Sequence, residues 1–321
     1  MYSVSQLSDI INSKISDIKY PEAPIGLYAP IQYTLSGGGK RLRPVLTLAV
    51  CSALGGQLDK VINQALGIEI FHNFTLLHDD VMDNADTRRG RPTVHRRWDV
   101  PTAILSGDAM LTMATQHISD IADDMLKSEA IALFNKTAME IYEGQQYDID
   151  FESRTDVTVN EYINMIRLKT SVLIGCACEM GALIAGAPEN IRKSFYRYGE
   201  KLGLAFQLQD DYLDTYGDSL KFGKQIGGDI LNDKKTWLLI SAIEQDVTDE
   251  TRNLIGSEIL PEAKIKRMKA VYERLNLPTK CHELIEKFID EAIAIVEHLE
   301  IDDDAKSFFI DLARKSATRD H

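Results

Sequence analysis

The chain has 321 residues, of which 44% are hydrophobic and 26% charged, an ordinary composition for a globular protein that can bury a sizeable core. Its 36 Lys and Arg residues against 49 Asp and Glu residues give a formal net charge of −13. This acidity argues against nucleic acid as a partner, because phosphate backbones select basic surfaces, and at first it also argues against a phosphorylated substrate.

Nothing in the sequence predicts a membrane span or a secretion signal. No run of about 18 apolar residues occurs, and the first residues lack a basic segment followed by an apolar one. We therefore expect a cytoplasmic protein with no stable membrane insertion. The four cysteines are few and irregularly spaced, which predicts buried thiols and neither a disulfide framework nor a zinc site.

Helices are expected along the whole chain. No proline occurs between Pro101 and Pro188, and the sequence contains no alternating runs of β-branched residues joined by hairpin turns. Before the first polar loop, which holds Gly90 and Pro92, the expected helices cover about 4–18, 24–36, 43–54 and 59–83. After it they cover about 102–120, 126–151, 159–186 and 189–216. Beyond a glycine-rich loop at 216–230, shorter helices cover about 233–246, 248–257, 262–275, 279–298 and 302–316.

No linker, low-complexity tract or tandem repeat divides the chain. The segments 59–83 and 159–186 are apolar on most faces, which is typical of helices at the centre of a bundle. The sequence therefore predicts a single all-α domain over residues 1–321.

The pattern DDxxD occurs twice, at Asp79–Asp83 and at Asp210–Asp214, each time at the end of a long apolar helix. Aspartates four residues apart project from one helix face, where they repel each other and face the negative end of the helix dipole. A cation should offset this repulsion, and clustered carboxylates that leave room for water and phosphate suit Mg²⁺. Two solvated acidic helix ends are the alternative, which the repetition of the motif makes less attractive.

Basic residues surround these motifs in the sequence. They are Lys40 and Arg43 after the Gly37–Gly39 break, Arg88 and Arg89 after the first motif, Lys169 beside Thr170 in a polar helix break, and Lys224 and Lys234 after the second motif. Arg forms bidentate bonds to phosphate oxygens and Lys supplies a mobile charge. Two acidic clusters with these cations imply two anionic groups, one bound through metal and one directly. A P-loop is excluded, because Arg41 follows Lys40 where Ser or Thr is required.

The segments GGGKRLRP, HDDVMD with RRGRPT, GDAML, GQQYD, LKTS and FQLQDDYLD with a later GGD and NDKKT occur in this order between residues 37 and 237. Together they resemble the trans-isoprenyl diphosphate synthases of the polyprenyl synthetase family, of the short-chain type. The resemblance implies an all-α bundle around a deep central cavity and a homodimer. It also implies a Mg²⁺-dependent head-to-tail (1′-4) condensation of isopentenyl diphosphate with dimethylallyl, geranyl or farnesyl diphosphate, by ionisation, condensation and elimination.

The resemblance also implies roles for individual residues. Asp79, Asp83 and Asp210 would be ligands of three Mg²⁺ ions, supported by Asp80, Asp211 and Asp214. The groups that would hold the allylic diphosphate are Arg88, Lys169, Gln207, Lys224 and Lys234. The groups that would hold isopentenyl diphosphate are Lys40, Arg43, His72 and Arg89. Thr170 would lie beside the first allylic carbon, and Lys169 and Thr170 would assist proton loss to the departing diphosphate.

Residues before the first motif should set the product length. Thr75, Phe74 and Phe71 precede Asp79 by four, five and eight positions. At ~1.5 Å per helical residue, Phe74 lies about 7 Å and Phe71 about 12 Å below Asp79. Two rings at these depths indicate a short product, unless both rings are simple core packing. The resemblance implies C15–C20, with C20 slightly favoured, because Phe74 but not Thr75 is aromatic and the first motif has no two-residue insertion.

Two other functions are compatible with an all-α fold and a DDxxD motif. A terpene cyclase shares the first motif, but its second metal motif is normally based on Asn, Ser and Glu, and it lacks the GGGKRLRP segment. A non-catalytic subunit of the same fold would be expected to have lost motif residues, whereas this chain retains them. We therefore expect an enzyme.

Overall fold

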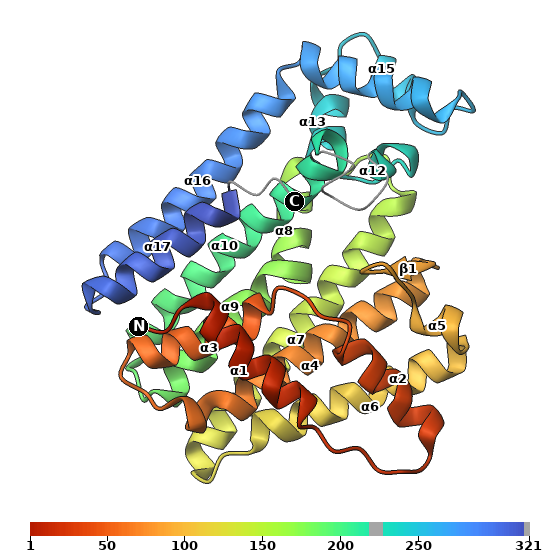
Figure 1. Cartoon of the computed structure of the whole chain (residues 1–321). Helices are drawn as coiled ribbons and strands as arrows, with labels where there is room; N and C mark the ends of the chain where they lie inside the picture. The colour runs from red at the N-terminus through yellow and green to blue at the C-terminus, as the bar shows by residue number, and fades with distance from the viewer. Residues whose placement is uncertain (218–226, 318–321) are drawn as a thin grey trace. The chain divides into compact units, whose positions relative to one another are not determined.

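The computed structural model describes residues 1–217 and 227–317 and confirms the all-α prediction (Figure 1). In this part of the chain the non-helical secondary structure is one antiparallel ribbon, in which β1 (Thr87–Arg88) pairs with β2 (Arg91–Pro92). Lys224, expected to bind the allylic diphosphate, lies outside the described residues. Over the same described ranges, no helix is both long enough and apolar enough to cross a bilayer.

The residue contacts divide the chain into two compact units. Unit 1 comprises Met1–Lys136, Cys176–Tyr196 and Ile301–Ala305. Unit 2 comprises Thr137–Gly175, Arg197–Glu300 and Lys306–His321.

Unit 1 is built on α4 (Leu58–Met82), which lies alongside α6 (Val100–Ser119) and also packs on α3 (Leu42–Ala53) (Figure 1). Gly67 permits this approach, because a Cβ there would lie 2.9 Å from the Ala114 carbonyl oxygen. The other helices of this unit are α1 (Val4–Ser16), α2 (Ile25–Leu35), α5 (Val94–Arg97) and the first turns of α7 (Asp124–Ser153). The result is that α4 is covered along most of its length and its acidic end carries the first motif.

Unit 2 contains the second half of α7, α8 (Val159–Ile166), a π-helical turn η1 (Arg167–Ser171) and most of α10 (Glu189–Tyr216). A capping box of Thr158 and Glu161 begins α8. The remaining helices are α9 (Val172–Ile184), of which unit 2 includes the first turn, α12 (Gly228–Leu231), α13 (Trp237–Gln245), α14 (Glu250–Leu254), α15 (Pro261–Arg274), α16 (Leu277–Glu297) and α17 (Asp303–Ala317). The second motif lies in the last turns of α10.

Three expectations about the elements need correction. The single helix expected over 159–186 is interrupted by the π-helical turn η1, and the backbones of Gly144 and Gly203 closely approach that turn. The polar loop after the first motif contains a ribbon and α5, since Arg89 and Gly90 both adopt the positive φ that a two-residue hairpin turn requires. The helix expected from 233 begins at Trp237, and α12 lies where a loop was expected.

Candidate active site

The first aspartate motif has one buried and two accessible carboxylates. Asp80 is 5% exposed, and its Oδ1 accepts a 2.7 Å hydrogen bond from Arg88 Nε. Burial raises the pKa of Asp80, and the Arg88 guanidinium opposes that shift. Asp79 is partly exposed and Asp83 is exposed at the helix end. Asp80 therefore anchors the loop that carries Arg88, while the outer pair keeps accessible surface.

The glycine break at residues 37–39 brings cationic side chains together. Arg89 Nη1 donates to the Gly38 carbonyl oxygen. Gly39 has φ +131°, and a Cβ there would lie 2.9 Å from Arg89 Nη2, so a side chain at this position would displace the guanidinium. Arg43 Nη1 lies 3.2 Å from His72 Nε2, and Lys40 is exposed at the end of the same break. Predicted ligands from three distant segments thus meet around one turn.

His72 takes part in this cluster as an acceptor. Burial, together with the positive charges of Arg43 and Arg89, lowers the pKa of His72 well below its ordinary value. The imidazole is therefore neutral at pH 7, and its Nε2 can accept from the Arg43 guanidinium. His72 consequently orients Arg43 without adding a positive charge.

Arg41, in the middle of the basic segment, has a structural role. It is 5% exposed, pairs with Glu69 at 2.6 Å and donates to the Leu35 carbonyl oxygen at 2.8 Å. Arg41 has a positive φ of 50°, and its side chain points inward, whereas Lys40 is exposed and Arg43 is partly exposed. The GKRLR segment therefore divides into one buried anchor, Arg41, and two basic residues with accessible surface, Lys40 and Arg43.

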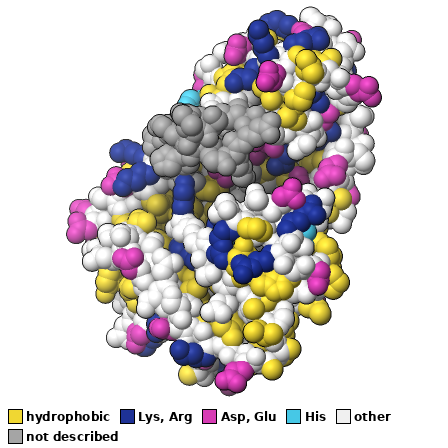
Figure 2. All heavy atoms as spheres, turned by 45° about the vertical axis from the view of Figure 1, so that its right-hand side comes forward, with side chains coloured by type: hydrophobic (Ala, Val, Ile, Leu, Met, Phe, Trp, Pro, Cys, Tyr) yellow, Lys and Arg dark blue, Asp and Glu magenta, His cyan; other side chains and the backbone are white. Residues whose placement is uncertain are grey.

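A pocket of unit 1 lies next to the first motif. Its lining includes Gly37, Asp80, Arg88, Arg89, Arg91 and Thr93. Arg91 was missed by sequence reasoning, although the third arginine of RRGR was a visible signal; its guanidinium lies 3.8 Å from the Tyr33 ring centroid. Figure 2 shows Lys and Arg side chains gathered on one face, although the chain is acidic overall. Three arginines around one pocket suit an anion with several oxygens.

In unit 2, the π-helical turn presents Lys169 and Thr170. Lys169 Nζ lies 2.5 Å from Asp148 Oδ2 of α7, and Thr170 Oγ1 donates to Gln207 Oε1 of α10 at 2.9 Å. Isolated π turns occur frequently at functional sites. Lys169 and Gln207 are both predicted ligands of the allylic diphosphate. The first is held by Asp148, and the second accepts a hydrogen bond from Thr170 of the same turn.

The second aspartate motif repeats the arrangement of the first. Asp211 is 6% exposed and accepts from Tyr162 Oη at 2.5 Å and from Gln207 Nε2 at 2.9 Å, whereas Asp210 and Asp214 are partly exposed. Asp214 Oδ2 accepts from the Asp229 amide at 2.8 Å, and Asp229 Oδ1 lies 3.7 Å from Lys234 Nζ. Lys234 is thus placed next to the motif.

The carboxylate oxygens of the motifs have the donor chemistry that Mg²⁺ prefers. Asp79 and Asp83 belong to unit 1 and Asp210 to unit 2. Among the described residues, no group of three or more His, Cys, Asp or Glu side chains is arranged to hold a metal ion. The donor set of each motif therefore fits the metal in type.

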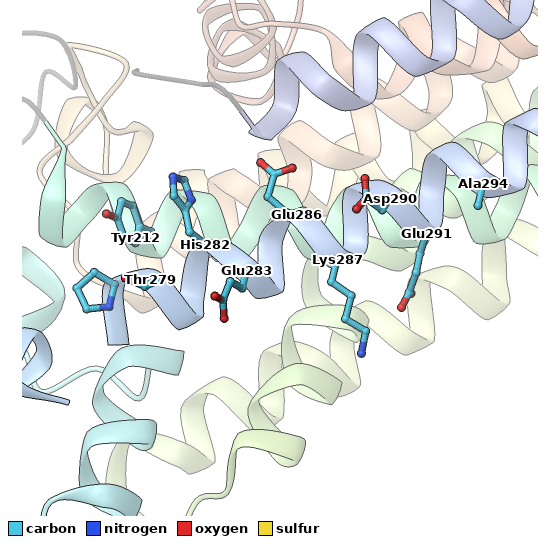
Figure 3. A pocket seen from close by; sticks show the side chains of 10 residues that line it. Tyr212, Thr279, His282, Glu283, Glu286, Lys287, Asp290, Glu291 and Ala294 are labelled. Carbon is cyan, nitrogen blue, oxygen red and sulfur yellow. The ribbon is translucent and has the colours of Figure 1, made fainter. Parts of the chain in front are cut away.

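A further groove in unit 2 runs along α16 beside Tyr212 (Figure 3). The Tyr212 ring stacks on His282 with centroids 5.4 Å apart. Its charged lining residues are Glu283, Glu286, Lys287, Asp290 and Glu291. Four carboxylates against one ammonium group would repel a diphosphate, so this groove is not the candidate active site.

The fold, the two aspartate motifs and the basic side chains near them define an all-α protein that can bind anionic groups. The polyprenyl synthetase family model matches residues 25–275 of this chain. The geranylgeranyl pyrophosphate synthase of Geoglobus acetivorans is 36% identical over 323 residues, which cover 99% of this chain and 98% of that protein.

Solved structures agree with this match. A crystal structure of a geranylgeranyl pyrophosphate synthase has a TM-score of 0.95 at 42% identity, with 99% of both chains covered. The polyprenyl synthase of Caulobacter crescentus CB15, complexed with calcium and isoprenyl diphosphate, has a TM-score of 0.86 at 26% identity, covering 99% of this chain and 94% of that one. The chain belongs to the polyprenyl synthetase family, and it is a prenyltransferase.

Proposed function

We propose that this prenyltransferase condenses isopentenyl diphosphate head to tail with an allylic diphosphate and releases diphosphate. The all-trans product is C15–C20, with C20 favoured. The observation that carries the proposal is the shared design of the two motifs, in which a buried, hydrogen-bonded middle aspartate supports accessible outer carboxylates. Such an arrangement is suited to a group that arrives with the substrate.

In this proposal Asp79, Asp83 and Asp210 hold three Mg²⁺ ions, and residues 1–321 form a single catalytic domain. The ions would neutralise the diphosphate charge as the allylic C–O bond breaks. A relative that is complexed with calcium and isoprenyl diphosphate supports a divalent cation at such a site. The acidity of the chain then excludes only the binding of this diphosphate without metal.

The basic and polar side chains of the site divide between the two substrates. Arg88, Lys169, Gln207, Lys224 and Lys234 bind the allylic diphosphate. Lys40, Arg43, His72 and Arg89 bind isopentenyl diphosphate. The allylic C–O bond breaks first, and the isopentenyl double bond then attacks the allylic cation. The proton that is lost afterwards passes to the departing diphosphate, so no nucleophilic side chain is required. The Thr170 hydroxyl and the Lys169 carbonyl face the reacting carbon.

Assembly as a homodimer is part of the proposal. In unit 1, α6 exposes Ile104 at 43% and Leu105 at 61%. In unit 2, α7 exposes Met139 at 57% and Ile149 at 40%. Exposed apolar residues recurring on a helix mark a surface that another chain covers. Light scattering after size exclusion should give twice the chain mass, and Met139→Lys with Ile149→Lys should reduce it to one chain mass.

The product length provides a prediction about unit 1. Phe71 is 0% exposed, and its ring lies 5.4 Å from Phe74 and 5.0 Å from Phe134, measured between centroids. We propose Phe134 of α7 as a third residue of the cavity floor, because its ring packs against Phe71. Phe74→Ala and Phe71→Ala should each lengthen the product by one or more C5 units, and Phe71→Ala should also destabilise the fold by about 3–5 kcal/mol.

Chromatography of the dephosphorylated products measures the chain length, and Phe151→Ala, which removes a buried ring of unit 2, is the matched control. Unchanged product length in both single variants and in the double variant would show that these rings are only core packing. Thr75, which donates to the His72 carbonyl oxygen at 2.8 Å, should have little influence because its hydroxyl is engaged by the helix.

One assay tests the proposed function. The purified chain is incubated with isopentenyl diphosphate, Mg²⁺ and either dimethylallyl, geranyl or farnesyl diphosphate, and the products are sized. Linear C15–C20 prenyl diphosphates are expected, together with complete dependence on the metal. No condensation with any primer would refute the proposal, and a cyclic hydrocarbon formed from a single substrate would identify a terpene cyclase.

A further inference from the structure

A buried tyrosine of unit 2 touches the second aspartate motif. Tyr162 of α8 is 1% exposed, and its Oη donates to Asp211 Oδ2 at 2.5 Å. Asp211 Oδ1 accepts from Gln207 Nε2 at 2.9 Å, and Gln207 Oε1 accepts from Thr170 Oγ1 at 2.9 Å. Four side chains are thus linked in sequence from α8, through two turns of α10, to the π-helical turn.

The chemistry of these groups determines the direction of each hydrogen bond. A carboxylate only accepts, so the Tyr162 phenol and the Gln207 amide nitrogen must both donate to Asp211. The Gln207 amide then presents its oxygen to Thr170, which must donate its single hydroxyl proton. The lone pairs of Thr170 Oγ1 therefore remain as acceptors for any other group.

We propose that Tyr162 is a positioning residue for the condensation, holding Asp211 and Gln207 so that Thr170 presents oxygen lone pairs to the developing allylic cation. This inference rests on the proposed function, which places Thr170 beside the reacting carbon. A fixed oxygen dipole stabilises positive charge effectively because it does not have to reorient during the reaction. Without the phenol, Asp211 loses one of two donors, the Gln207 amide can rotate, and the Thr170 proton can turn toward the cation.

The test compares two variants that each lose one buried phenolic hydroxyl. Tyr162→Phe removes the donor to Asp211. The matched control is Tyr198→Phe, because Tyr198 is 0% exposed and donates at 2.8 Å to the Phe309 carbonyl oxygen, also within unit 2. Both variants should lower the melting temperature by a similar amount. Only Tyr162→Phe should lower kcat, by about 10- to 100-fold, the usual effect of removing a supporting partner. The KM for isopentenyl diphosphate should not change.

Two further measurements separate positioning from a purely structural role. Adding Mg²⁺ with inorganic diphosphate should raise the melting temperature less for Tyr162→Phe than for Tyr198→Phe. This measurement does not depend on turnover. The double variant Tyr162→Phe with Thr170→Val should have the kcat of Thr170→Val alone, because both changes act on one hydroxyl. If Tyr162→Phe proves unstable, Gln207→Met breaks the same link and should show the same loss of kcat.

The outcomes are distinguishable. Equal kcat for Tyr162→Phe and Tyr198→Phe, or a double variant whose defects multiply, overturns the inference while leaving the proposed function intact. A wild-type chain that makes no prenyl diphosphate overturns the proposed function itself.

Discussion

Asp79→Asn is expected to lower kcat by about a thousandfold, the scale on which one preorganised charge-stabilising group contributes to catalysis. Asp79 and Asp83 lie four residues apart at the end of α4, where Asp79 is partly exposed and Asp83 is exposed. The amide keeps the shape of the side chain but loses the negative charge that an oxygen ligand of Mg²⁺ supplies. The Mg²⁺ concentration for half-maximal rate should rise in parallel.

The stability of the same variant should move in the opposite direction. Removing one carboxylate relieves the repulsion with Asp83 and the unfavourable interaction with the helix dipole. The free protein should therefore be as stable as the wild type or more stable by about 0.3–1 kcal/mol. A fall in kcat without a fall in melting temperature identifies a site whose local strain serves function.

Asp86→Asn is the matched control for Asp79→Asn. The Asp86 carboxylate is 80% exposed and pairs with Arg96 at 2.8 Å on the surface after the first motif. An exposed pair of this kind contributes at most about 1 kcal/mol, so its loss should leave kcat within about twofold. Equal activities of the two variants would contradict the assignment of Asp79 as a metal ligand.

Gly144→Ala should give the second largest effect. A Cβ at Gly144 would lie 2.3 Å from the Lys169 amide nitrogen and 2.7 Å from the Leu168 carbonyl carbon, both backbone atoms of the π-helical turn. Backbone cannot move aside as a flexible side chain can, so η1 must shift. Overpacking of this kind costs about 1–3 kcal/mol, and a misplacement near 1 Å at a reacting centre lowers the rate by about a hundredfold.

Steady-state kinetics and thermal unfolding measure both effects, with Gly26→Ala as the control because nothing lies within 4 Å of a Cβ at that position. Gly203→Ala should resemble Gly144→Ala, since its Cβ would lie 2.5 Å from Ser171 Cα on the same turn. A Gly144→Ala enzyme with wild-type kcat would show that the exact placement of η1 does not matter for the reaction.

The pattern of apolar and charged residues was sufficient to predict the helices and the two aspartate motifs. The helix that carries the second motif was expected over 189–216 and coincides with α10. Its apolar periodicity is a local property of the sequence. The break at Lys169 and Thr170 was visible as polar residues inside an apolar helix. Its π winding is not visible in the sequence, and neither is its close contact with Gly144 and Gly203, which lie far from the break along the chain.

The division of labour within each motif is also a tertiary property. The sequence does not distinguish Asp80 from Asp79, yet Asp80 is buried against Arg88 and Asp79 is partly exposed. The buried role of Arg41 and the donation from Tyr162 to Asp211 likewise depend on partners 28 and 49 positions away. Burial and hydrogen-bond partners of this kind are set by packing, which a spacing rule does not contain.

The sequence by itself determined the all-α class, the two aspartate-rich helix ends and the cations that accompany them, because helix periodicity and charge spacing act over a few residues. Only the tertiary structure decided which carboxylates and guanidinium groups are anchors and which are accessible, and how Thr170 is oriented. Those properties depend on desolvation and on contacts between segments far apart in the chain.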